Sequence, residues 1–179
     1  MDRMIPLVEN LPVGPPADTN AAMGPVITRQ SLDRITSLLQ SGIDKGAKLL
    51  VDGRGVKVPG HENGFFIGAS LFDHVTPEMD IYKEEIFGPV LSTVRVPDYE
   101  SAIKLIHGNQ YANGVAIFTR DGDAARDFVN RIEVGMVGVN VPIPVPVGFH
   151  SFGGWKKSMF GSHHIYGPDS IHFYTRLKA

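Results

Sequence analysis

The chain of 179 residues contains no cysteine. It can therefore form no disulfide bond and no thiolate metal site, and it carries no cysteine nucleophile of its own. The chain also lacks an excess of charge of either sign, since 17 Lys and Arg residues stand against 19 Asp and Glu residues and give a formal net charge of −2. We therefore expect no nucleic-acid partner.

Long hydrophobic runs are missing as well, and no stretch is long and apolar enough to span a bilayer, so we expect no membrane partner. The first residues, Met1-Asp2-Arg3-Met4, lead into Ile5-Pro6-Leu7-Val8 and not into the apolar core of a signal peptide. These features predict a cytoplasmic protein. With 42% hydrophobic and 20% charged residues, the composition is that of an ordinary globular domain.

Metal ions and phosphate loops have little support in the sequence. The chain has seven histidines, but His163 and His164 are adjacent, a spacing that does not direct two imidazoles from one helix face to a common ion. Gly53-Arg54-Gly55 lacks the Lys-Ser or Lys-Thr pair of a phosphate-binding loop. We expect no metal site.

The first half of the chain predicts an arm followed by a long helix. Residues 1–27 contain five prolines and should be extended or looped. Thr28 is suited to cap a helix over about residues 29–45, because apolar residues recur there at helical spacing and Gly46 ends the pattern. Three shorter elements are predicted next: strands at residues 48–51 and 64–72, and a short helix that Thr76-Pro77 begins.

The second half alternates strands with helices, which implies βαβ crossovers and a mostly parallel sheet. Residues 114–119 form an unbroken apolar run, typical of a strand buried on both faces. The predicted order is a strand at 89–96, a helix from Asp98 to about 106, the strand at 114–119, a helix capped by Asp121 or Asp123, and a strand at 135–140. We therefore predict a three-layer α/β fold, in which a mostly parallel sheet lies between two layers of helices.

Two segments near the C-terminus have distinct patterns. Residues 141–148 carry proline at alternate positions, which removes hydrogen-bond donors and predicts an extended apolar loop. Apolar and polar residues alternate from Ile171 to Leu177, which predicts a β-strand. Such a strand, if exposed, would present unpaired backbone groups that can pair with the strand of another chain.

The stretch Lys83-Glu84-Glu85-Ile86-Phe87-Gly88-Pro89-Val90 mixes acidic and aromatic residues before a forced turn. Gly88-Pro89 must turn the chain, so Glu85 and Phe87 lie at the entrance to a strand. A carboxylate there can accept hydrogen bonds from a sugar diol, and an aromatic ring two residues on can lie against a flat heterocycle. The alternative is that Glu85 is a solvated turn acid and Phe87 a core residue.

The same stretch resembles the EIFGPV motif of the aldehyde dehydrogenase superfamily. The Pro-rich connection at residues 13–27 and the segments YANGVAIFT and VGMVGVN resemble that superfamily too, and the resemblance covers nearly all of the chain. It implies NAD as cofactor, with Glu85 holding the ribose on the nicotinamide side and Phe87 in contact with the nicotinamide region.

The resemblance also places two residues near the substrate. Asn140 corresponds to a strand-end Asn beside the substrate site, although it could instead end the strand through local hydrogen bonds. Phe152, in the segment SFGGWKKS, corresponds to an aromatic residue near the aldehyde. The segment IPVPVGFHSFGGWK and the ending GPDSIHFYT are most similar to the CoA-acylating, methylmalonate-semialdehyde branch of the superfamily.

In that branch a cysteine thiolate attacks a small semialdehyde, hydride passes to NAD, and CoA accepts the acyl group while carbon dioxide is lost. Because the chain has no cysteine, we expect the nucleophile and the coenzyme-binding region to lie before Met1. The resemblance then divides the chain into an arm (1–27), part of a catalytic domain (28–165) and an oligomerisation strand (166–179) that joins a dimer or tetramer. The alternatives are a stand-alone, non-catalytic module that joins full-length subunits through its last strand and, third, a nucleotide-binding module without enzymatic activity.

Overall fold

The computed structural model describes residues 1–179 and divides them into two compact units. The N-terminal unit runs from Met1 to Arg95 and the C-terminal unit from Val96 to Ala179. Both combine helices with short sheets, which confirms the predicted α/β class. None of the helices is long and apolar enough to cross a membrane.

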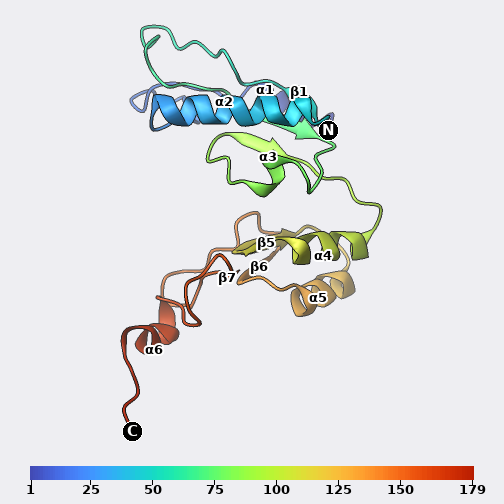
Figure 1. Ribbon diagram of the computed structural model, residues 1–179, viewed down its shortest axis with the longest axis vertical. Coiled ribbons are helices and arrows are strands. Elements are labelled where there is room, and N and C mark those ends of the chain that lie inside the picture. Colours follow the sequence, from blue (N-terminus) through green and yellow to red (C-terminus); the bar gives the residue numbers. More distant parts are fainter. The chain divides into compact units, whose positions relative to one another are not determined.

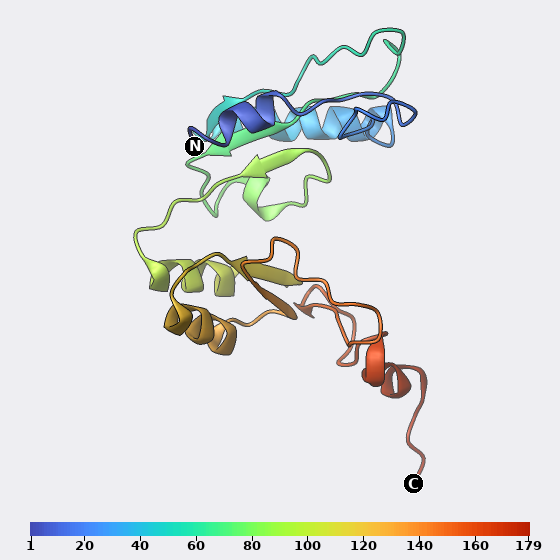
Figure 2. The same ribbon diagram turned by 180° about the vertical axis from the view of Figure 1, so that it is seen from behind.

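The N-terminal unit is built on a three-stranded sheet between two helices. Strand β2 (Ser70–Asp73) lies in the middle, antiparallel to β1 (Lys48–Val51) and parallel to β3 (Val90–Ser92). Helix α2 (Arg29–Asp44) faces the viewer in Figure 1 and α1 (Ile5–Glu9) in Figure 2, so the two helices lie on opposite sides of the β1–β2 pair. All four residues of β2 are buried, as a strand covered on both faces should be.

The core of this unit forms where α2 meets the sheet. Ile35 and Leu39 on α2 and Phe72 on β2 are at most 1% exposed, and they belong to one apolar cluster. The predicted cap of α2 is confirmed, because the Thr28 side chain accepts a hydrogen bond from the Ser31 N–H. Gly46 follows the helix at φ +92°, a conformation that glycine adopts without strain.

Several expectations for the N-terminal unit were wrong in detail. The arm is not wholly extended: Pro6 occupies the first turn of α1, a position where its missing N–H costs no hydrogen bond. Residues 64–67 are not a strand, and Thr76-Pro77 forms a turn, so the short helix α3 begins only at Asp80 (Asp80–Lys83). Strand β3 covers three residues rather than 89–96, since it pairs with β2 over that length only.

The C-terminal unit contains the predicted strand, helix and strand. Helix α4 (Tyr99–Gly108) is capped by Asp98, and helix α5 (Gly122–Arg131) by Asp121 rather than Asp123. Between them run strands β4 (Tyr111–Ala112) and β5 (Gly114–Ile117), and β6 (Met136–Val139) follows α5 and pairs in parallel with β5. Ile103 of α4, Phe128 of α5 and Ile132, the residue directly after α5, form the core with apolar residues of the β5–β6 pair.

The sheets are mixed, and only two of the four strand pairings are parallel. Strand β7 (Trp155–Lys156) pairs antiparallel with β4, a contact that the sequence pattern did not predict. Strand β5 was expected to be buried on both faces but is only half-buried, because β6 is its one partner strand and α4 and α5 pack against one face of the pair.

The prediction of a C-terminal β-strand was wrong, because most of this segment is helical. Residues Gly167–Asp169 form a 3₁₀ turn, η1, and Ser170–Tyr174 form helix α6, which packs against η1. Pro168 stands in the first turn of this helical segment, and a helix supplies its own hydrogen bonds where no neighbouring strand does. Residues 141–148 form the expected loop without strand structure.

Candidate functional site

The predicted ribose-binding residues lie on a short loop between α3 and β3. Ile86 is buried among the core residues of the N-terminal unit, while Glu85 and Phe87 on either side of it point outward. Phe87 has a φ of +57°, a left-handed conformation that costs energy for a side chain of this size. Other contacts must therefore stabilise this backbone conformation of the loop.

Arg34 on α2 stabilises the loop through three hydrogen bonds. Its Nη1 donates to the Ile86 carbonyl at 2.9 Å, and its Nη2 donates to the Glu85 carbonyl at 2.9 Å and to the Glu84 carboxylate at 3.2 Å. The neighbouring helix residue, Ile35, packs under Gly88, where an added Cβ would lie 2.5 Å from the Ile35 Cδ1. Two consecutive residues of α2 thus support the whole turn.

Both predicted binding groups are free of partners within the chain. The Glu85 carboxylate is exposed and accepts no hydrogen bond, and the Phe87 ring is 79% exposed. The alternative interpretation of Phe87 as a core residue is therefore wrong, and Ile86 is the core residue of this loop. A fixed loop that presents a free carboxylate and a free aromatic face is chemically suited to a diol and a flat ring.

Asn140 directly follows β6, and its side chain is hydrogen-bonded to Thr119, two residues after the end of β5. Its Oδ1 accepts from the Thr119 N–H and its Nδ2 donates to the Thr119 carbonyl, both at 3.0 Å. This is the local hydrogen bonding that the alternative interpretation of Asn140 requires. Together with Phe118, Thr119 and Arg120, Asn140 also lines an open hollow of about 520 Å³, so the residue borders a space that a small molecule can enter.

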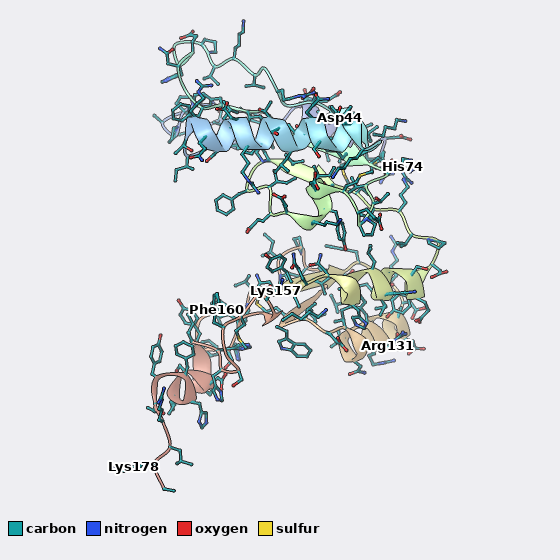
Figure 3. The ribbon with its side chains drawn as sticks, in the orientation of Figure 1. Asp44, His74, Arg131, Lys157, Phe160 and Lys178 are labelled. Atoms are coloured by element: carbon teal, nitrogen blue, oxygen red, sulfur yellow. The ribbon has the colours of Figure 1, made fainter.

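Phe152 lies in a second hollow of the C-terminal unit, apart from the one at Asn140. It stacks on Tyr166 with ring centroids 4.6 Å apart and planes 11° from parallel. The hollow measures about 300 Å³ and is lined mainly by apolar and aromatic side chains, among them Met159 and Phe173. Phe160 at its rim is 97% exposed and is labelled in Figure 3.

Polar groups border this second hollow. The His163 ring lies 3.1 Å from the Asp169 carboxylate, and the His164 N–H donates to the same carboxylate. The backbone N–H of His164, and after it the His163 ring, hold the pKa of Asp169 below its ordinary value. The chain brings together no group of three or more His, Asp or Glu side chains that could hold a metal ion.

Arg34 and Tyr166 were not singled out from the sequence. Arg34 lies about fifty positions before the loop that it contacts. The one signal in the sequence was its position next to Ile35, a residue on the apolar face of the predicted helix. Tyr166 precedes the Gly-Pro pair of the tail and was not linked to Phe152 by any spacing. Glu85 and Phe87 lie in the N-terminal unit, and Asn140 and Phe152 in the C-terminal unit.

Comparison with known proteins decides the family. A profile of the Aldehyde dehydrogenase family matches residues 1–179, the whole chain. The chain belongs to the aldehyde dehydrogenase family. It is 58% identical over 177 residues to the malonate-semialdehyde dehydrogenase of Pseudomonas aeruginosa, and 48% identical over 178 residues to the acylating, mitochondrial methylmalonate-semialdehyde dehydrogenase of Arabidopsis thaliana. Each match covers 99% of this chain.

A solved structure supports the same assignment. The Sinorhizobium meliloti protein, assigned as a methylmalonate-semialdehyde dehydrogenase and crystallised with NAD, is 62% identical and superimposes on 98% of this chain with a TM-score of 0.95. The chain spans about a third of the length of these relatives: 36% of the Pseudomonas and Sinorhizobium proteins and 29% of the Arabidopsis protein. The family assignment thus rests on one continuous portion of a longer relative.

Proposed function

We propose that this chain is the C-terminal portion of an NAD-dependent, CoA-acylating malonate- or methylmalonate-semialdehyde dehydrogenase. The observation that carries the proposal is the loop at Glu85–Phe87, which presents a free carboxylate and a free ring on a backbone held by Arg34. The names of the similar proteins supply the substrate class, a short aldehyde that carries one carboxylate. The parent enzyme oxidises it to an acyl-CoA with loss of carbon dioxide.

The residues of the loop fit NAD by their chemistry. When bound, NAD accepts the hydride of the aldehyde. Glu85 accepts hydrogen bonds from the ribose diol and Phe87 lies against the ring system, so that together they orient the nicotinamide half for the transfer. Neither group has to break a bond within the chain in order to bind, because neither has a partner there.

The substrate side belongs to the C-terminal unit in this proposal. Asn140 borders one hollow, and Phe152 stacks on Tyr166 in the other, whose mainly apolar lining suits the hydrocarbon part of a small aldehyde. The nucleophilic cysteine comes from a part of the enzyme outside these 179 residues, since the chain contains none. By itself the chain is then inactive, and CoA is the acyl acceptor of the parent enzyme.

The exposed C-terminal tail bears on how the parent enzyme assembles. The tail beyond Asp169 exposes Ile171, Phe173, Tyr174 and Leu177, the last of them completely. We propose that this segment, with the preceding residues from 166, joins subunits of a cytoplasmic dimer or tetramer and takes up strand structure when it meets a partner edge. Residues 1–27 are then an arm and residues 28–165 part of the catalytic domain.

Glu85→Gln in the complete dehydrogenase tests the central role. We expect turnover to fall roughly tenfold or more while the unfolding temperature changes little, because the exposed carboxylate has no hydrogen bond within the chain. The matched control is Glu133→Gln, an exposed acid that follows α5 and has no hydrogen-bond partner. Equal turnover in Glu85→Gln and the parent enzyme would remove Glu85 from the coenzyme site.

The size of the natural product separates the proposal from its alternative. An antibody raised against this chain should detect a band about three times larger in a lysate of the source organism, since the chain spans 36% of its relative from Pseudomonas. A band at the 19.5 kDa mass of this chain would instead favour a stand-alone module that joins complete subunits. Coenzyme titration of the isolated chain would then show whether such a module binds NAD at all.

A further inference from the structure

We propose that Arg34 is the positioning residue of the coenzyme loop: it sets the direction of Glu85 and Phe87 through their backbone. The inference rests on the proposed role of Glu85 and adds to it a residue from a different element. Arg34 lies on α2, a helix whose next residue, Ile35, is 1% exposed in the core. Its backbone is therefore fixed next to the core of the N-terminal unit.

Residues 85–87 at the centre of the loop have no other polar support. The N–H groups of residues 85–87 have no partner within the chain, and the only hydrogen bonds to their carbonyls come from Arg34, at 2.9 Å each. The hydrogen bonds of Glu84 N–H to Asp80 and of Val90 N–H to Gly88 lie on either side of this gap. Losing the guanidinium would leave residues 85–87 held only by the Ile86 side chain and by the packing of the adjacent Gly88 on Ile35.

The strained residue lies where such support is needed. Phe87 keeps φ at +57°, and a strained backbone persists only when its surroundings fix it. Arg34 fixes the two carbonyls that come directly before Phe87. The Arg34–Glu84 ion pair adds little, because both side chains are about half exposed and exposed pairs are weak.

Lysine cannot replace arginine in this role. A guanidinium is a planar fork that can donate in several fixed directions at once, and here two of its nitrogens serve two successive carbonyls and a carboxylate. An ammonium keeps the charge but not the fork. Arg34→Lys is therefore the variant that removes the positioning function and leaves the local charge unchanged.

The first arm of the test is a double-mutant cycle in the complete dehydrogenase. We expect Arg34→Lys to lower turnover roughly tenfold with an unchanged KM for the aldehyde, and to have a clearly smaller effect when Glu85→Gln is already present, because only the orientation of Phe87 is then left to lose. The control is Arg29→Lys on the same helix, whose guanidinium lies over the Phe65 ring and does not contact the loop. Independent, multiplicative effects of Arg34→Lys and Glu85→Gln would overturn the proposal.

The second arm follows the loop itself and does not depend on NAD. In the 179-residue chain, limited chymotrypsin cleavage at the Phe87–Gly88 bond is compared by mass spectrometry with cleavage at the fully exposed Phe160–Gly161 bond. Arg34→Lys should raise the ratio of the two rates roughly tenfold, because a released loop opens more often, and Arg29→Lys should not. An unchanged ratio would sink the inference even if the enzyme were impaired.

The two arms distinguish failure of this inference from failure of the proposed function. If Glu85→Gln alone leaves turnover unchanged, the coenzyme role of the loop is wrong, and the cleavage ratio by itself decides whether Arg34 holds the loop. If Glu85→Gln impairs turnover and Arg34→Lys does not, the function stands and the role of Arg34 is refuted.

Discussion

Asp73 is the most buried acid of the chain, with only 5% of its side chain exposed at the end of β2. Arg95 donates to both of its carboxylate oxygens, at 2.8 and 2.7 Å. This paired hydrogen bonding lowers the pKa of Asp73 from its ordinary value of 3.8 to about 2. The neighbouring residue, His74, labelled in Figure 3, has a φ of +56° and contributes its N–H to the same carboxylate.

The depressed pKa predicts how stability depends on pH. Because the folded-state pKa of Asp73 lies below the ordinary value, its contribution is complete above about pH 4 and is lost as the pH falls toward 2. Asp73→Asn should lower the thermal unfolding midpoint at pH 6 and flatten the decline between pH 4 and 2. Asp33→Asn, at an exposed acid of α2 without hydrogen bonds, serves as control, and parallel declines for Asp73→Asn and the parent would contradict the prediction.

At the scale of single residues, the sequence singled out the exposed side chains of the candidate loop but not the residue that supports them. Glu85 and Phe87 could be singled out because a breaker pair follows them and because their motif is specific. Arg34 could not, since a helical arginine is ordinarily a solvated charge and nothing local reveals which carbonyls it will reach. Asn140 was singled out with two possible roles, and the structure shows that its hydrogen bonds to Thr119 and its place beside a hollow coexist.

The β4–β7 pairing depends on a glycine contact between distant segments. An added Cβ at Gly135 would lie 1.8 Å from the Gly153 carbonyl oxygen and 2.8 Å from the Gly154 Cα, so the two backbones touch there. Gly135 also donates to the Ala112 carbonyl on β4 at 3.0 Å. The two glycines after Phe152 thus place that residue by direct backbone contact.

Gly135→Ala should therefore destabilise the C-terminal unit. Overpacking of this kind costs about 1–3 kcal/mol, and the obstacle here is backbone, which cannot turn aside as a side chain can. Chemical denaturation measures the loss. Gly148→Ala is the matched control, because a Cβ there meets no atom within 4 Å, and equal stability of the two variants would contradict the close contact.

Elements with local signals were predicted well and paired elements were not. Thr28, Asp98 and Asp121 each cap a helix near the expected position, since a cap and its helix lie within a few residues of each other. Strands β4 and β7 have two residues each and exist only because they meet. No periodicity within either segment could reveal that meeting.

The tail raises the question of assembly for the whole molecule. Ile171, Tyr174 and Leu177 are 67%, 72% and 100% exposed, more apolar surface than a short helix ordinarily leaves in water. Removal of residues 171–179 from the complete dehydrogenase should lower its native mass toward that of one subunit, as measured by light scattering. Removal of Lys178 and Ala179 alone is the control, and an unchanged mass after the longer deletion would refute the proposed interface.

The sequence by itself determined the α/β class, the capped helices α2, α4 and α5, and the loop that carries Glu85 and Phe87, because each of these follows from residues close together in the chain. Only the tertiary structure decided what depends on distant partners: the mixed pairing of the sheets, the hydrogen bonds of Arg34 to residues 84–86 and the stacking of Phe152 on Tyr166. It also decided the conformation of the tail. An alternating pattern becomes a strand only beside another strand, and within this chain residues 170–174 satisfy their backbone as a helix instead.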